Sequence, residues 1–209
     1  MKKLIFCLFL FSTVVSLNAQ TKETSTFTPN VYVAAYGGLS ALIAKDNNLF
    51  QSSNTLSFSN NVKWGSAVAV GYDFSPILGV RWELGYSQNK WKDNLSGVVD
   101  KFWLESLTAD LMINLTNCIW GYNSERIIDV QAFVGGGGGI TDYISNSRGD
   151  IFTPIVRVGL QGSYHLNQNI DISLELAANG VSNNYNDATG GSFFDGIPTA
   201  MAGISYHFR

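Results

Sequence analysis

Apolar and polar residues alternate along most of the chain with a period of two, the spacing of a β-strand with one apolar and one polar face. Most of the alternating segments are longer than the ~5–6 residues of an ordinary globular strand and match the ~9–11 residues of a membrane-spanning strand. No window after the first twenty residues repeats apolar residues at helical spacing, so no helix is predicted there. Eight strands are predicted, at residues 31–43, 62–74, 78–86, 102–115, 127–140, 155–166, 170–177 and 199–208.

The connections between the predicted strands alternate in length. Residues 75–77 and 167–169 form short turns, and residues 116–126 form a medium one. The other connections are long and rich in Asn, Ser, Asp and Gly: residues 44–61, 87–101, 141–154 and 178–198. This alternation is typical of an eight-stranded antiparallel up-and-down β-barrel in the bacterial outer membrane, with short periplasmic turns and long extracellular loops.

The two faces of each predicted strand differ in polarity. Along residues 155–166, for example, Val158 and Leu160 share one face while Arg157 and Gln161 share the other. A soluble sandwich would bury the apolar face, whereas a membrane barrel would turn it to lipid. Aromatic residues gather near the predicted strand ends, as membrane interfaces require, and favour the membrane barrel. A soluble lipocalin-like barrel is the least favoured alternative.

In a barrel of eight strands the polar faces meet in a narrow lumen that holds little besides side chains. Unpaired charges buried there cost several kcal/mol, so we expect them to pair in a structural plug rather than an ion pathway. A turn centred on Gln168 sets His165 opposite Asp171 and Gln161 opposite Glu175. The predicted lumen network comprises Asp73, Arg81, Glu83, Asp110, Asp129, Arg157, Gln161, His165, Asp171 and Glu175.

Composition narrows the function classes. The chain has 209 residues, 45% of them hydrophobic and 14% charged, with a net charge of −3, which suits one domain and argues against nucleic-acid binding. Two histidines and two cysteines are too few for a metal cluster. The glycine run 135–139 lacks the Lys-Ser/Thr of a phosphate loop and more simply lets a strand bend or approach its neighbour. No cofactor is predicted.

Enzymatic activity is not predicted either. Ser163, His165 and Asp171 share a face and could imitate a hydrolase triad, but we expect them to form structural hydrogen bonds in a filled lumen. Cys118 is expected to be a semi-buried thiol in the medium turn.

The first nineteen residues have the features of a cleaved secretory signal peptide. Lys2 and Lys3 precede an apolar run over residues 4–15, and Ala19 is a suitable small residue before the cleavage point. The run is shorter than the ~20 apolar residues of a membrane-spanning helix. We therefore assign residues 1–19 to the signal peptide, 20–30 to a short periplasmic segment and 31–209 to the barrel.

The last strand carries a second sequence signal. Gly203, Tyr206 and Phe208 resemble the C-terminal signal by which outer-membrane barrels are handed to the assembly machinery. With this motif and the eight-strand layout, the chain resembles the small OmpA-type, porin-like barrels, in the short form without a periplasmic domain. The resemblance implies an outer-membrane location, contact with its lipids and recognition by the barrel assembly machinery. The Asn-Ala-Gln sequence at residues 18–20 resembles the start of mature exported proteins of Bacteroidetes.

The expected role is structural or interactive: envelope integrity, surface binding, or an accessory subunit of an outer-membrane complex. Phe193 and Phe194, in the last long connection, are the predicted contact for an outer-membrane or surface protein. A narrow channel and a lipid-modifying enzyme are the two alternatives.

Overall fold

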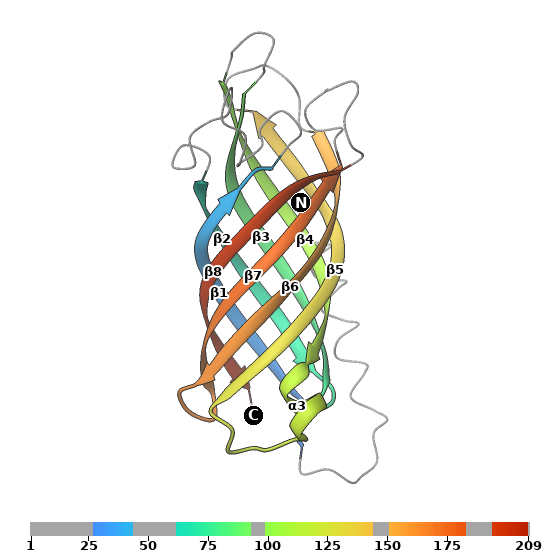
Figure 1. Ribbon diagram of the computed structural model, residues 1–209, viewed down its shortest axis with the longest axis vertical. Helices are drawn as coiled ribbons and strands as arrows, with labels where there is room; N and C mark the ends of the chain where they lie inside the picture. Colours follow the sequence, from blue (N-terminus) through green and yellow to red (C-terminus); the bar gives the residue numbers. More distant parts are fainter. Residues whose placement is uncertain (1–26, 44–61, 93–98, 144–150, 183–193, 209) are drawn as a thin grey trace, which may run out of the picture.

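The computed structural model describes residues 27–43, 62–92, 99–143, 151–182 and 194–208, and these form one closed barrel (Figure 1). Each strand pairs antiparallel with the next along the chain, and the first pairs with the last. The predicted eight-stranded, antiparallel, up-and-down barrel is thus confirmed. The strands are β1 (Asn30–Ala41), β2 (Val62–Asp73), β3 (Leu78–Lys92), β4 (Val99–Asn114), β5 (Ile128–Tyr143), β6 (Ile151–His165), β7 (Ile170–Ser182) and β8 (Phe194–Phe208).

The barrel has two different ends. We call the end that carries the connections 74–77, 115–127 and 166–169 the turn end, and the opposite end the loop end. The turns fix the predicted register: Arg81 lies opposite Gly71, and His165 lies opposite Asp171. A tight turn allows few registers, and a slip by one residue would exchange the two faces of a strand, so the sequence pattern determines these pairings.

Strands β3 to β8 extend further at the loop end than predicted, whereas β2 begins at Val62 as predicted and β1 ends at Ala41, two residues earlier than predicted. β3 continues to Lys92 and β4 already begins at Val99, and β7 and β8 are lengthened in the same way. Apolar alternation fades there, as at Asn89, yet the ladder to Phe102 of β4 continues. Pairing with a neighbouring strand therefore overrides the local composition.

A short helix interrupts the all-β pattern, so the prediction of no helix is wrong. α3 (Leu115–Trp120) follows β4 at the turn end; the Asn114 side chain caps it by accepting a 2.8 Å hydrogen bond from the Asn117 N–H, and Gly121 ends it with φ 74°. Six residues are too few for helical periodicity to show in a sequence. No helix in the described ranges is long and apolar enough to cross a membrane.

The orientation of the two strand faces agrees with the prediction. Leu160 and Leu174 point outward and are 50% and 59% exposed, whereas Arg81 and Glu175 point into the lumen and are 0% and 2% exposed. A soluble fold would place these side chains the other way round. The outer surface of this barrel is therefore suited to an apolar surrounding.

Candidate functional site

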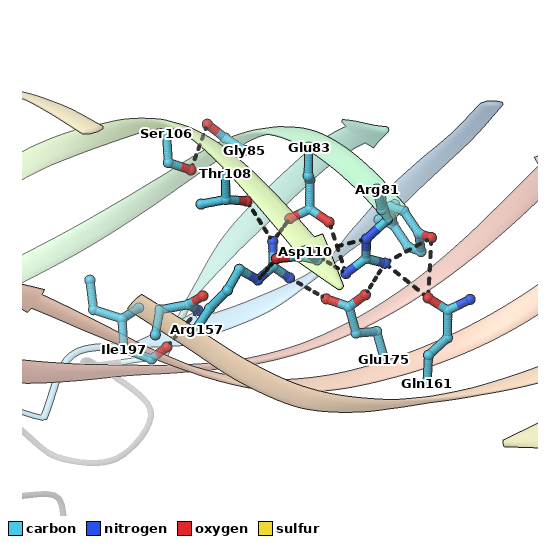
Figure 2. A network of polar contacts seen from close by, with 12 residues as sticks. Arg81, Glu83, Gly85, Ser106, Thr108, Asp110, Arg157, Gln161, Glu175 and Ile197 are labelled. Atoms are coloured by element: carbon cyan, nitrogen blue, oxygen red, sulfur yellow. Dashed lines mark hydrogen bonds and ion pairs between the residues drawn. The ribbon is translucent and has the colours of Figure 1, made fainter. Parts of the chain in front are cut away.

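A layer of five charged side chains fills the middle of the lumen (Figure 2). It consists of Arg81, Glu83, Asp110, Arg157 and Glu175, which β3, β4, β6 and β7 direct inward. Arg81 donates from Nε and Nη2 to Asp110 Oδ2 at 3.1 and 2.8 Å. Its Nη1 donates to Glu175 Oε2 at 2.6 Å.

Arg157 completes the layer. Its Nη2 donates to Glu175 Oε1 at 2.7 Å, and its Nη1 donates to Glu83 Oε1 and, at 3.2 Å, to Thr108 Oγ1. Each carboxylate oxygen of Glu175 thus accepts from a different guanidinium. Such shared, charge-assisted bonds are what allow ions to remain buried, because an isolated ion would cost several kcal/mol.

Two aromatic side chains that were not predicted from the strand pattern also belong to this layer. The centre of the Phe133 ring lies 4.7 Å from the Arg81 guanidinium carbon and 5.0 Å from that of Arg157. The Tyr36 hydroxyl accepts from Arg81 Nη1 at 3.3 Å and donates to Gln161 Oε1 at 3.3 Å. The alternation of polar and apolar residues did not reveal them, because a single aromatic residue on an otherwise polar strand face is an exception to that alternation.

A second layer closes the lumen closer to the loop end. It is apolar and buried, and it consists of Leu42, Phe102, Leu104, Ile155, Val181 and Ile197. Leu104, Ile155 and Arg157 all line a cavity of only about 40 Å³ beside the charged layer. At these six positions the rule of polar residues inward fails, although buried polar residues such as Thr141 and Thr153 lie on neighbouring inward positions. The lumen is consequently sealed twice.

At the turn end the lumen opens into a polar vestibule of about 510 Å³, lined in part by Asp73, Asp129, His165, Asp171 and His207. His165 bonds through Nδ1 to Asp171 Oδ1 at 2.7 Å and through Nε2 to Asp129 Oδ2 at 3.3 Å. His207 Nε2 lies 2.8 Å from Asp171 Oδ2.

The predicted network residues therefore lie in two places rather than one. Arg81, Glu83, Asp110, Arg157 and Glu175 form the charged layer, and Gln161 joins it through Arg81 at 2.9 Å. Asp129, expected in the same plug, instead lies in the vestibule and pairs with Arg126 at 3.3 Å. Asp129 lies at the start of β5, near the turn end, whereas the residues of the charged layer lie near the middle of their strands. Asp73 also lines the vestibule, opposite Gly79.

Ser163, His165 and Asp171 are not arranged as a hydrolase triad. Both ring nitrogens of His165 face carboxylates, and in the described part of the chain none of its hydrogen bonds involves a serine. Ser163 Oγ instead accepts from Gln161 Nε2 at 3.1 Å. No group of three or more His, Cys, Asp or Glu within the described ranges is placed to hold a metal ion.

Aromatic residues mark both edges of the outer apolar surface. Near the loop end the rings of Tyr86 and Trp103 stack at 4.9 Å, and Trp64 lies 5.9 Å from Trp103. Near the turn end Tyr206 and Phe208 are exposed with their rings 5.0 Å apart. We call these two groups the loop-end belt and the turn-end belt.

The residues of the C-terminal motif, together with Phe194 and Cys118, lie within the described part of the chain. Tyr206 and Phe208 are outward residues of β8, while the Tyr36 ring lies against Gly203. Phe193 lies outside the described residues, and Phe194 is the first residue of β8. Cys118 is exposed, not semi-buried as expected, because it lies on the open side of α3.

No protein-family model matches the chain, and no curated protein matches its sequence. Solved structures do match. Neisserial surface protein A (NspA) aligns with a TM-score of 0.56 at 13% identity, over 87% of this chain and 100% of that one. Ail, the attachment invasion locus protein of Yersinia pestis, in complex with the heparin analogue sucrose octasulfate, aligns with a TM-score of 0.54 at 13% identity over the same shares.

A major outer membrane protein from Thermus thermophilus aligns with a TM-score of 0.55 at 12% identity, over 87% of this chain and 100% of that one. Identities this low establish a shared architecture and nothing finer. Strand number, pairing and closure agree with these alignments. The chain therefore has the fold of the small outer-membrane β-barrels.

Proposed function

We propose that this protein is a non-enzymatic, non-conducting barrel of the outer membrane, of the small OmpA-type, porin-like kind, with a structural or surface-binding role. The observation that carries the proposal is the double seal: a charged layer and an apolar layer both fill the lumen of a barrel whose outside is apolar. A solute would have to displace Arg81 and Glu175 from their ion pairs to pass.

The dimensions support a membrane location. β1 has 12 residues, and at ~3.3 Å per residue with a tilt of roughly 40° it rises about 30 Å. That height spans the ~25 Å apolar band of an outer-membrane barrel. The loop-end and turn-end belts then lie at the two interfaces, where tyrosine and tryptophan are enriched.

The remaining assignments follow from this location. The turn end faces the periplasm, the loop end faces the exterior, and the outward side chains contact outer-membrane lipids. Gly203, Tyr206 and Phe208 serve as the signal to the assembly machinery, and an export signal in residues 1–19 fits the same route. NspA is a surface protein by its name, and Ail was solved with a heparin analogue. Both favour a binding role for the loop end, where Phe193 and Phe194 remain the proposed contact.

Conductance measurements test the proposal. The purified protein is refolded, its barrel is verified by slower migration of the unheated sample on a denaturing gel, and it is added to planar bilayers. We expect correctly inserted protein to leave the bilayer silent. Discrete, reproducible conductance steps from folded wild-type protein would overturn the non-conducting role, and failure to insert would overturn the membrane location.

A further inference from the structure

An apolar groove of about 1010 Å³ runs over the outer face of the barrel between β1 and β6. Its floor is made of small outward residues, among them Ala109 of β4 and Gly136 of β5, whereas the Phe152 ring covers Gly138. Trp82 of β3 and Phe152 of β6 are among the large side chains that line it. The groove lies on the surface assigned above to lipid.

The glycine run of β5 creates this groove. Gly136 lies opposite Ala109, so two small outward residues adjoin at this place on the barrel wall. A Cβ on Gly137 would come within 2.8 Å of the Thr108 Cα, which shows how closely β5 approaches β4. The expected close approach of the run is therefore present, and the depression outside is its consequence.

A carboxylate lies in the groove at its loop-end side. Glu105 is exposed on the outward face of β4, two residues from Trp103, and lies opposite Tyr86 of β3 and Ile140 of β5. No hydrogen bond or ion pair connects it to another residue of the described ranges. A charge on the lipid side of an aromatic belt is costly unless a cation meets it.

We propose that this groove binds a lipid whose headgroup carries an ammonium group, with the ammonium against Glu105 and an acyl chain along Ala109 and Gly136, beside the Phe152 ring. The proposal rests on the membrane location proposed above. The stacked rings of Tyr86 and Trp103 adjoin Glu105, and aromatic faces attract an ammonium ion as a carboxylate does.

Charge complementarity favours a lipid over a second copy of the chain. In the described strands, the outward-facing side chains between the two belts include no lysine or arginine. Lys101 is exposed on β4, but it lies two residues beyond Trp103 toward the loop end. A second barrel packed alongside could not bring a described cation to the depth of Glu105, whereas an aminolipid of the outer leaflet carries one there.

Native mass spectrometry of the folded protein in neutral detergent tests this inference. Phosphatidylethanolamine and phosphatidylglycerol with the same acyl chains are added separately at equal concentration. We expect the wild-type protein to hold about threefold to fivefold more phosphatidylethanolamine, the size expected for an exposed ion pair. Glu105→Gln should abolish the preference. Asp142→Asn is the matched control, because Asp142 is also exposed on the outer face but does not line the groove.

A second pair of variants tests the groove itself. Ala109→Leu fills the floor and should reduce bound lipid of both kinds, whereas Ala200→Leu enlarges an exposed alanine of β8 outside the groove and should not. Equal phosphatidylethanolamine binding by wild-type and Glu105→Gln protein would overturn the proposal. So would a dimer that dissociates in Ala109→Leu, since the groove would then belong to a second copy.

The outcome is separable from that of the proposed function. If the protein inserts into bilayers but Glu105→Gln keeps the wild-type lipid preference, only the lipid site is wrong. If the folded protein does not insert into bilayers, the membrane location is wrong as well.

Discussion

Arg81 of β3 and Glu175 of β7 are 94 residues apart in the sequence and meet at 2.6 Å in the centre of the lumen. β3 and β7 share no backbone hydrogen bonds, so this ion pair ties opposite walls of the barrel, and the same carboxylate also binds Arg157 of the adjacent β6 at 2.7 Å. Backbone ladders hold each strand to its neighbours, and this carboxylate adds a connection across the interior.

Loss of that carboxylate should destabilise the barrel. Glu175→Ala leaves two buried guanidinium groups each without one partner, and we expect a loss of about 3–5 kcal/mol in the free energy of unfolding. Asp142→Ala, on the exposed outer face, should change it by less than about 0.5 kcal/mol. Urea unfolding in vesicles, followed by tryptophan fluorescence, measures both. Equal stability of the two variants would show that the charged layer contributes nothing.

The two seals should act independently on conductance. Arg81→Ser weakens the charged layer but leaves the apolar layer intact, so the bilayer should stay silent. Adding Phe102→Gly, which removes a ring that is 1% exposed in the apolar layer, should produce discrete conductance steps. Phe102→Gly alone serves as the reciprocal control and should be silent. Conductance from either single variant would contradict the double seal.

Gly203 of β8 and Gly162 of β6 should differ sharply in their tolerance of a methyl group. A Cβ on Gly203 would meet the Tyr36 ring and, at 3.0 Å, the Ala35 carbonyl oxygen, so Gly203→Ala should cost about 1–3 kcal/mol. Gly162 has nothing within 4 Å of its Cβ position, and Gly162→Ala should be neutral or slightly stabilising. Refolding without the assembly machinery separates this effect from any role of Gly203 in the C-terminal assembly signal.

α3 should anchor the turn end in the periplasmic membrane interface. Ile119 and Trp120 are 68% and 72% exposed, and tryptophan favours the headgroup region. In a variant that keeps Trp120 as its only tryptophan, lipids brominated near the headgroup should quench its fluorescence most. A variant that keeps only Trp82, which lies between the belts, should be quenched most by bromine deep in the chains. Water-like, unquenched Trp120 emission would rule the anchor out.

The fold was readable from the sequence because one strong rule governs it. Alternation places Leu160 outward and Arg157 inward, and short turns such as that at Gln168 leave one register in which the charges meet. The pairing of His165 with Asp171 follows directly from that register.

Other features depend on information that alternation does not carry. Phe133 packs against two arginines because strands from other parts of the barrel wall meet it across the lumen, and its sequence neighbours do not predict that contact. Asp129 shares a face with the plug residues, but its height along β5 places it in the vestibule. The groove beside Glu105 arises from small residues on two adjacent strands, which becomes apparent only once Ala109 and Gly136 are paired.

The pairing of β1 with β8 places Val31 opposite Phe208, almost the full length of the chain apart. Until this contact forms, β1 and β8 are edge strands with unpaired backbone N–H and C=O groups, which favour aggregation. Contacts so distant in sequence also form slowly. Closure of the cylinder therefore has to wait for β8, and a holding factor that shields both edges until then should raise the yield of native protein.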